Sequence, residues 1–185
     1  SPKPITITNS AVTRTYDAST TYGAVASSLS YTTNTALVGS DTIGSLTQSF
    51  SDTNGPISTG QIIKAGTFSS TPTAVVLSSG SLSNYSFSYN STSNSVAKAN
   101  LSISAVPSLT GNAYNGQVYT GTYTTTALGS DASSISVSGL ASGTNAGTYT
   151  SALTATGSVL TNYNTPIISN ANLVIDKRSI GFNAN

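Results

Sequence analysis

Alternating apolar and polar residues mark the segment 85–89, which reads Tyr85-Ser86-Phe87-Ser88-Tyr89. Because successive side chains of a β-strand point to opposite faces, this order places three aromatic rings on one face and two hydroxyls on the other. The same alternation recurs along the chain in the segments 4–8, 101–103, 118–123 and 135–140. Gly, Asn, Asp and Ser residues typical of turns separate these segments at short intervals. The pattern predicts many short strands.

Helical patterns are missing from the sequence. No stretch of about 12 residues carries apolar residues at the 3.6-residue period of an amphipathic helix. Many short strands with frequent turns are typical of antiparallel sandwiches and barrels. The sequence therefore predicts an all-β fold.

The composition excludes several classes of function. Among 185 residues, 35 are Ser and 30 are Thr, while only six are Lys or Arg and all five acids are Asp. Without His or Cys the chain cannot build a Ser-His or Cys-His nucleophile, and zinc loses its usual nitrogen and sulfur ligands. We therefore expect no enzyme, no cofactor and no metal site. A net charge of +1 indicates no nucleic-acid partner, and no apolar run approaches the roughly 18 residues of a membrane span.

Five short motifs occur twice in the same order, which predicts an internal repeat. The matching pairs are 16–18 with 114–116, 39–41 with 129–131, 65–70 with 146–151, 82–85 with 160–163, and 99–103 with 171–175. The offset between the copies falls from 98 to 72 residues, so the first copy is predicted to be longer. Length differences between fixed motifs are typical of loops on a common scaffold.

The repeat sets the expected domain organisation. The first β module is predicted over 1–103, with loop insertions, and the second over 104–176. Both are expected to be antiparallel β-sandwiches of the Ig-like type, arranged in tandem and end to end. Residues 177–185 are expected to begin a following repeat or a linker, because 176–182 loosely resembles the opening 3–7.

The repeated motifs resemble the YDG/MBG ("mostly β, glycine-rich") repeats of large, filamentous-haemagglutinin-like bacterial surface adhesins. The similarity covers nearly the whole chain twice, although the copies read Tyr16-Asp17-Ala18 and Tyr114-Asn115-Gly116 in place of Tyr-Asp-Gly. The resemblance implies an extracellular or bacterial cell-surface location and a place in a longer array.

We therefore expect a non-catalytic fragment of an adhesin that acts as a stalk or spacer and projects a binding region. Its partners would be the neighbouring repeats of the same chain and a host or biofilm glycan or protein receptor. The alternative is a receptor- or glycan-binding module, with its site in the loop insertions of the first copy.

Three residues are candidates for that ligand site. Asp52 and Asn54 lie in the largest insertion, and Asn90 opens the glycosylation sequon Asn-Ser-Thr in an expected loop over 90–94. The same loops would have no ligand if they are simple length variation. Two other possibilities remain open, a calcium ion at Asp52 and Asn54 and an isopeptide crosslink from Lys64 or Lys98.

The repeated acidic positions are expected to be structural. Asp17 and Asn115 should bond to their own backbone in tight turns beside packed tyrosines. Asp41 and Asp131 both follow Gly-Ser, which predicts a turn at each position.

Overall fold

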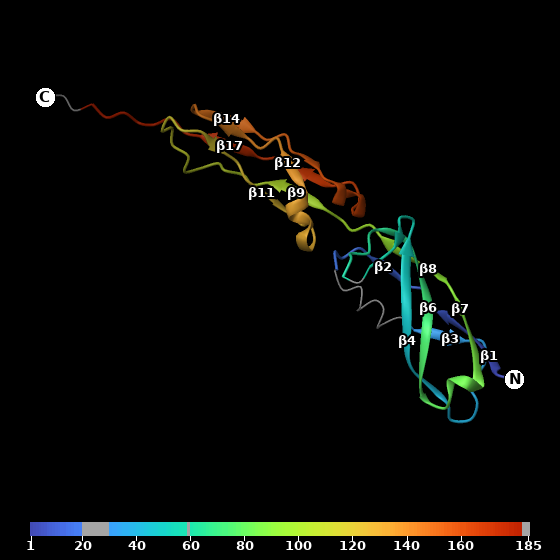
Figure 1. Cartoon of the computed structure of the whole chain (residues 1–185). Coiled ribbons are helices and arrows are strands. Elements are labelled where there is room, and N and C mark those ends of the chain that lie inside the picture. The colour runs from blue at the N-terminus through green and yellow to red at the C-terminus, as the bar shows by residue number, and fades with distance from the viewer. Residues whose placement is uncertain (20–29, 59, 183–185) are drawn as a thin grey trace. The chain divides into compact units, whose positions relative to one another are not determined.

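The computed structural model describes residues 1–19, 30–58 and 60–182, and these residues form mostly β-strands (Figure 1). The prediction of an all-β fold is confirmed. Within the described ranges the helices are three short 3-10 turns, and none has the length and apolar character that crossing a membrane requires. The chain divides into two compact units, Ser1–Lys98 and Ala99–Asn185.

The alternating segment 85–89 forms most of strand β7 (Tyr85–Asn90) in the first unit. β7 pairs with β1 (Lys3–Asn9), and β1 pairs on its other side with β3 (Tyr31–Thr33). In this register Phe87 lies opposite Ile5, and Tyr89 lies opposite Ile7. The aromatic face of β7 and the isoleucines of β1 therefore share one core, which also contains Val75.

A five-stranded sheet completes the first unit. A long hairpin of β4 (Thr42–Asp52) and β6 (Gly66–Ser79) lies at its centre (Figure 1). The strand order is β2-β8-β6-β4-β5, with β2 at Thr13–Thr15, β8 at Thr92–Ala97 and β5 at Gly55–Pro56.

Shorter strands build the second unit. Its three-stranded sheet has the order β11 (Tyr123–Thr125), β9 (Ser102–Ala105) and β16 (Ile167–Ser169). Three two-stranded sheets join β10 (Tyr119–Thr120) with β13 (Ser142–Gly143), β12 (Ser136–Ser138) with β15 (Thr154–Thr156), and β14 (Gly147–Thr150) with β17 (Asn172–Ile175). The 3-10 turns are η1 (Leu82–Asn84) in the first unit, and η2 (Gly129–Ser134) and η3 (Ser158–Asn162) in the second.

The prediction of purely antiparallel sheets is wrong. β7 runs parallel to β1, β8 runs parallel to β2, and β16 runs parallel to β9. The physical reason is that side chains alternate with a period of two in either strand direction, so alternation in the sequence does not reveal the direction of the partner.

The boundary between the units lies after Lys98, not after Ile103 as the sequence predicted. β9 pairs with β11 and β16, so Ile103 is buried inside the second unit. The segment 99–103 therefore opens the second unit and does not close the first. Both 99–103 and 171–175 read Ala-Asn-Leu-x-Ile, and such a pattern marks a strand without identifying its partners.

Backbone pairing provides a better correspondence between the units. β9 lies between an antiparallel neighbour, β11, and a parallel neighbour, β16, as β1 lies between the antiparallel β3 and the parallel β7. In these registers Ile103 corresponds to Ile7. Gly66 pairs with Val96 as Gly147 pairs with Ile175. From the opening to the closing strand, the first unit is then 17 residues longer, and not 26 as the motif offsets indicated. Twelve of the additional residues lie between Asp41 and Tyr85, in the β4–β6 hairpin and the segment that follows it.

Candidate ligand-binding site

The tip of the long hairpin brings two of the three predicted site residues together. Asp52 ends β4 and pairs with Gly55 of β5 across the two-residue turn Thr53-Asn54. The Asn54 backbone N–H donates a 2.7 Å hydrogen bond to Oδ1 of Asp52. Asp and Asn favour such turns because their short side chains bond to the nearby backbone.

The chain then returns to β6 through a loop over 57–65, of which residues 57–58 and 60–65 are described. Two of its three isoleucines, Ile57 and Ile63, are buried, and the Ile57 N–H donates to the Phe50 carbonyl at 2.9 Å. The Gln61 N–H donates to the Ser58 carbonyl at 3.1 Å, and Oε1 of Gln61 accepts from the Ser58 N–H at 2.9 Å. Burial and these hydrogen bonds therefore hold Ile57, Ser58, Gln61 and Ile63 in place.

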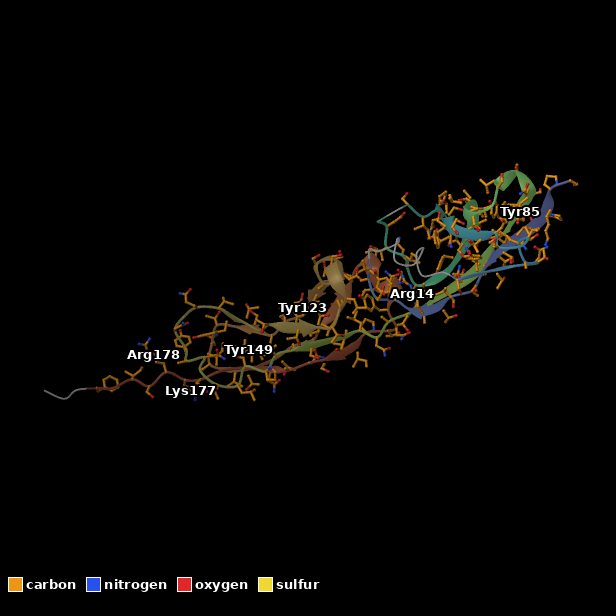
Figure 2. The ribbon with its side chains drawn as sticks, turned by 90° about the horizontal axis from the view of Figure 1, so that it is seen from below. Arg14, Tyr85, Tyr123, Tyr149, Lys177 and Arg178 are labelled. Carbon is orange, nitrogen blue, oxygen red and sulfur yellow. The ribbon has the colours of Figure 1, made fainter. Side chains whose placement is uncertain are left out.

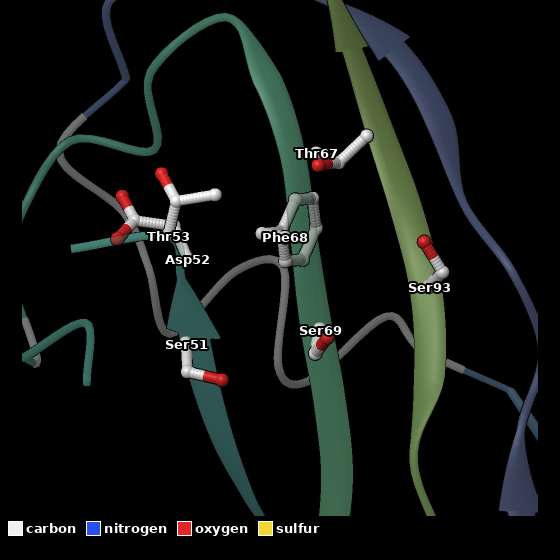
Figure 3. A pocket seen from close by; sticks show the side chains of 7 residues that line it. All are labelled: Ser51, Asp52, Thr53, Thr67, Phe68, Ser69 and Ser93. Carbon is white, nitrogen blue, oxygen red and sulfur yellow. The ribbon is translucent and has the colours of Figure 1, made fainter. Parts of the chain in front are cut away.

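Asp52 lines three adjoining hollows at this tip. The hollow in Figure 3 measures about 200 Å³ and has Asp52 and Thr53 at the end of β4, Phe68 on β6 and Ser93 on β8. The second measures about 280 Å³, and its wall includes Asn54 and Lys64. The third measures about 200 Å³, and its wall includes Asn54, Gln61 and Lys64. The lining is rich in hydroxyl and amide groups.

Opposite charges face the second and third hollows without forming an ion pair. Asp52 and Lys64 line both, but among the described residues the only ion pair is the one between Arg14 and Asp17, at 3.3 Å. Lys64 is exposed, as is Lys98, so neither lysine has the burial that an isopeptide crosslink requires. No group of three or more metal-ligating side chains lies within the described residues, and Asp52 is the single carboxylate at the hairpin tip.

Asn90 does not join the other two candidates. It ends β7 in the three-stranded sheet, and its side-chain amide donates to the Thr8 hydroxyl at 3.3 Å. The loop predicted over 90–94 is absent, because β8 begins at Thr92. The chain passes from one sheet to the other at Ser91, which the sequence did not indicate because residues 90–95 are all polar and show no apolar alternation that would mark a strand.

The repeated Asp17 and Asn115 form the predicted turns. Oδ1 of Asp17 accepts from the Ser19 N–H at 2.9 Å, and Oδ1 of Asn115 accepts from the Gln117 N–H at 2.8 Å. The residue after each has a positive φ, +54° at Ala18 and +77° at Gly116.

The two tyrosines beside these turns differ. Tyr16 is buried as predicted, but 41% of Tyr114 is exposed. Tyr114 lines a further hollow of about 340 Å³ with Lys177 and Arg178, which follow β17 (Figure 2).

Two tyrosine–aspartate hydrogen bonds were not predicted from the sequence. The Tyr85 hydroxyl donates to Oδ2 of Asp41 at 2.7 Å, and the Tyr163 hydroxyl donates to Oδ2 of Asp131 at 2.7 Å. Asp41 and Asp131 also form the predicted turns, because each N–H donates to the carbonyl three residues earlier. The signal was present, since all four residues belong to repeated motifs.

Each tyrosine hydroxyl also accepts a backbone hydrogen bond. The Val38 N–H donates to Tyr85 and the Leu128 N–H donates to Tyr163, both at 2.9 Å. Burial raises the pKa of Tyr163 to about 12, and the bond to Asp131 contributes to the rise. Burial and the bond to Asp41 raise the pKa of Tyr85 in the same way. Both hydroxyls therefore stay protonated and serve as structural donors.

Comparisons with protein-family models, with curated proteins and with solved structures return no match to this chain.

Proposed function

We propose that the chain is a non-catalytic segment of a bacterial extracellular adhesin, in which tandem β-sandwich modules act as a stalk or spacer. The observation that carries this proposal is the matched pair of tyrosine–aspartate hydrogen bonds, Tyr85 to Asp41 and Tyr163 to Asp131. Equal contacts at equal places in two units are expected of a repeated scaffold. The binding region would lie elsewhere in the adhesin.

The use of the aspartates supports a structural role. Asp41 and Asp131 accept tyrosine hydroxyls, while Asp17 and Asp52 accept backbone N–H groups in turns. Four of the five carboxylates therefore hold the backbone or a core tyrosine. Acid–base catalysis needs a carboxyl group positioned against a substrate, and these bonds favour scaffold chemistry instead.

A fusion experiment tests the spacer proposal. A capture domain is fused to the N-terminus of the chain, the C-terminus is attached to a surface, and capture of large particles is measured. A spacer predicts that deleting the chain reduces capture and that an unrelated rigid segment of equal length restores it. Capture that only this chain restores would contradict the proposal.

The second candidate function is a receptor- or glycan-binding module with its site in the first unit. The observation that favours it is the group of hollows around Asp52, which are lined by residues of the longer hairpin. Saturable binding of the chain to a glycan array or to cells, lost on substitution of Asp52, would support it.

A further inference from the structure

We propose that the hollow shared by Asp52 and Lys64 binds a sugar residue that carries a carboxylate. This inference rests on the second candidate function, ligand binding at the hairpin tip, and adds the chemical class of the ligand.

Two groups of opposite charge at this hollow, the Asp52 carboxylate and the Lys64 ammonium, can each form further hydrogen bonds. Oδ1 of Asp52 accepts the Asn54 N–H, while Oδ2 has no hydrogen-bond partner among the described residues. The Lys64 ammonium likewise has no ion-pair or hydrogen-bond partner within the described part of the chain. Because the two groups line the same hollow without meeting, a ligand that bridges them would satisfy both.

The signs of the charges define the ends of that ligand. An ammonium donates strong hydrogen bonds to a carboxylate, and an ionised Asp accepts strong hydrogen bonds from hydroxyl groups. A sugar acid has both features on one ring, with a carboxylate at one end and hydroxyl donors at the other. Its carboxylate would face Lys64, and its hydroxyls would face Asp52 and the polar groups of Thr53 and Asn54.

Size and shape favour one sugar residue bound through polar contacts. The hollow measures about 280 Å³, which is below the roughly 300–1,000 Å³ of pockets for drug-sized ligands. Phe68, its one aromatic lining residue, is only 3% exposed, so no ring face is open for stacking. Without stacking, the charge on Lys64 becomes the main source of discrimination between a sugar acid and a neutral sugar.

The Asp52 side of the hollow is held in place before any ligand arrives, because Asp52 is fixed by its turn. Near Lys64, Ile57 and Ile63 are buried, and Ser58 and Gln61 bond to each other. Such pre-organisation lowers the entropy cost of binding.

Titration of the whole chain with single sugars tests the proposal by calorimetry. The probes are glucuronic acid and N-acetylneuraminic acid as carboxylated sugars of two kinds, with glucose as the neutral match of the first. At least one acidic sugar is expected to bind saturably, at least tenfold more tightly than glucose. The preferred acid identifies the source of the carboxylate. Because the Lys64 ammonium would attract the carboxylate electrostatically, the affinity is expected to fall as salt is added.

Three variants locate the site. Lys64→Gln is expected to reduce acid binding to the level of glucose, and Asp52→Asn to weaken it at least tenfold while keeping the Oδ1 acceptor of the turn. Lys98→Gln, which removes an exposed lysine of the same unit that lines none of these hollows, is the matched control and should leave binding unchanged. An equal loss in Lys98→Gln would overturn the assignment.

The remaining outcomes separate this inference from the function on which it rests. Glucose binding as tight as that of the acids, and lost in Asp52→Asn, would overturn the sugar-acid assignment while leaving ligand binding at the hairpin tip intact. Absence of saturable binding by every probe at millimolar concentrations would overturn the sugar-acid assignment, and the glycan-array and cell-binding assays would then decide the second candidate function separately.

Discussion

The Tyr163 hydroxyl links two segments of the second unit, because it donates to Asp131 at 2.7 Å and accepts from the Leu128 N–H at 2.9 Å. Tyr85 makes the same two bonds in the first unit, to Asp41 and from Val38. In each unit the tyrosine hydroxyl connects the turn that ends at the aspartate to the segment that contains the tyrosine. That segment is strand β7 for Tyr85 and an isolated β-bridge for Tyr163. The same polar contact therefore recurs in both units.

Tyr163→Phe removes both of these bonds without changing the size of the ring. Because Asp131 is 3% exposed, it loses a donor that water cannot readily replace. The expected loss in the free energy of unfolding is about 2 kcal/mol, measured by urea denaturation. Tyr123→Phe is the control, since the Tyr123 hydroxyl has no hydrogen-bond partner among the described residues. Equal effects of the two substitutions would contradict the role of the pair.

Alkaline pH should destabilise the second unit through Tyr163. Its pKa is raised from 10.0 to about 12 in the folded chain. A raised folded pKa contributes stability that is complete below pH 10 and is lost as the pH rises from 10 to 12. The difference in stability between the native chain and Tyr163→Phe should therefore shrink across this range. Phenolate absorbance should show one fewer late-ionising tyrosine in the variant, and an unchanged titration would disprove the expectation.

Gly80→Ala should disturb the Tyr85–Asp41 pair, because the added methyl group would crowd the Asp41 carboxylate. Gly80 has φ +90°, and a Cβ there would run into the Asp41 carboxylate. Gly111 has a similar φ of +83° with open space at its Cβ, so Gly111→Ala measures the backbone cost alone, about 1 kcal/mol. Gly80→Ala is expected to cost at least about 1 kcal/mol more, because the Tyr85–Asp41 bond is lost as well. In a Tyr85→Phe background this additional cost should nearly disappear, and its persistence would refute the link.

Salt should have little effect on stability. The one ion pair among the described residues joins Arg14 and Asp17, and 53% of the Asp17 side chain is exposed. Exposed pairs contribute about 0–1 kcal/mol and are screened by salt. The free energy of unfolding is therefore expected to change by less than about 1 kcal/mol between low salt and about 1 M NaCl. A larger loss would contradict the expectation, because it would require charge interactions beyond the single ion pair seen among the described residues.

The sequence predicted local structure better than it predicted which strands pair with one another. Alternation identified strand β7, and the short side chains of Asp17 and Asn115 correctly indicated turns. Strand direction and the unit boundary were missed, because a residue such as Ile103 alternates in the same way whichever strand it joins. Pairing depends on contacts between distant segments, which local patterns do not encode.

At the candidate site, too, the sequence predicted local contacts and missed contacts between distant segments. Asp52 and Asn54 are two positions apart and share one turn, so the sequence could bring them together. Lys64 was not predicted to join them, because it reaches the hollow only through the pairing of β4 with β6 and the return of the loop. The sequence also predicts Asn90 as a site residue, but Asn90 lies on β7 in another sheet, since hydroxyl and amide residues in a polar stretch do not show which sheet they join.

Single-molecule pulling on the two ends of the chain tests most directly the claim that each unit is a self-contained module held by its own tyrosine–aspartate pair. Two separate unfolding steps are expected, with Tyr85→Phe lowering the force of one step and Tyr163→Phe lowering the force of the other. A single cooperative step, or two variants that weaken the same step, would contradict the account.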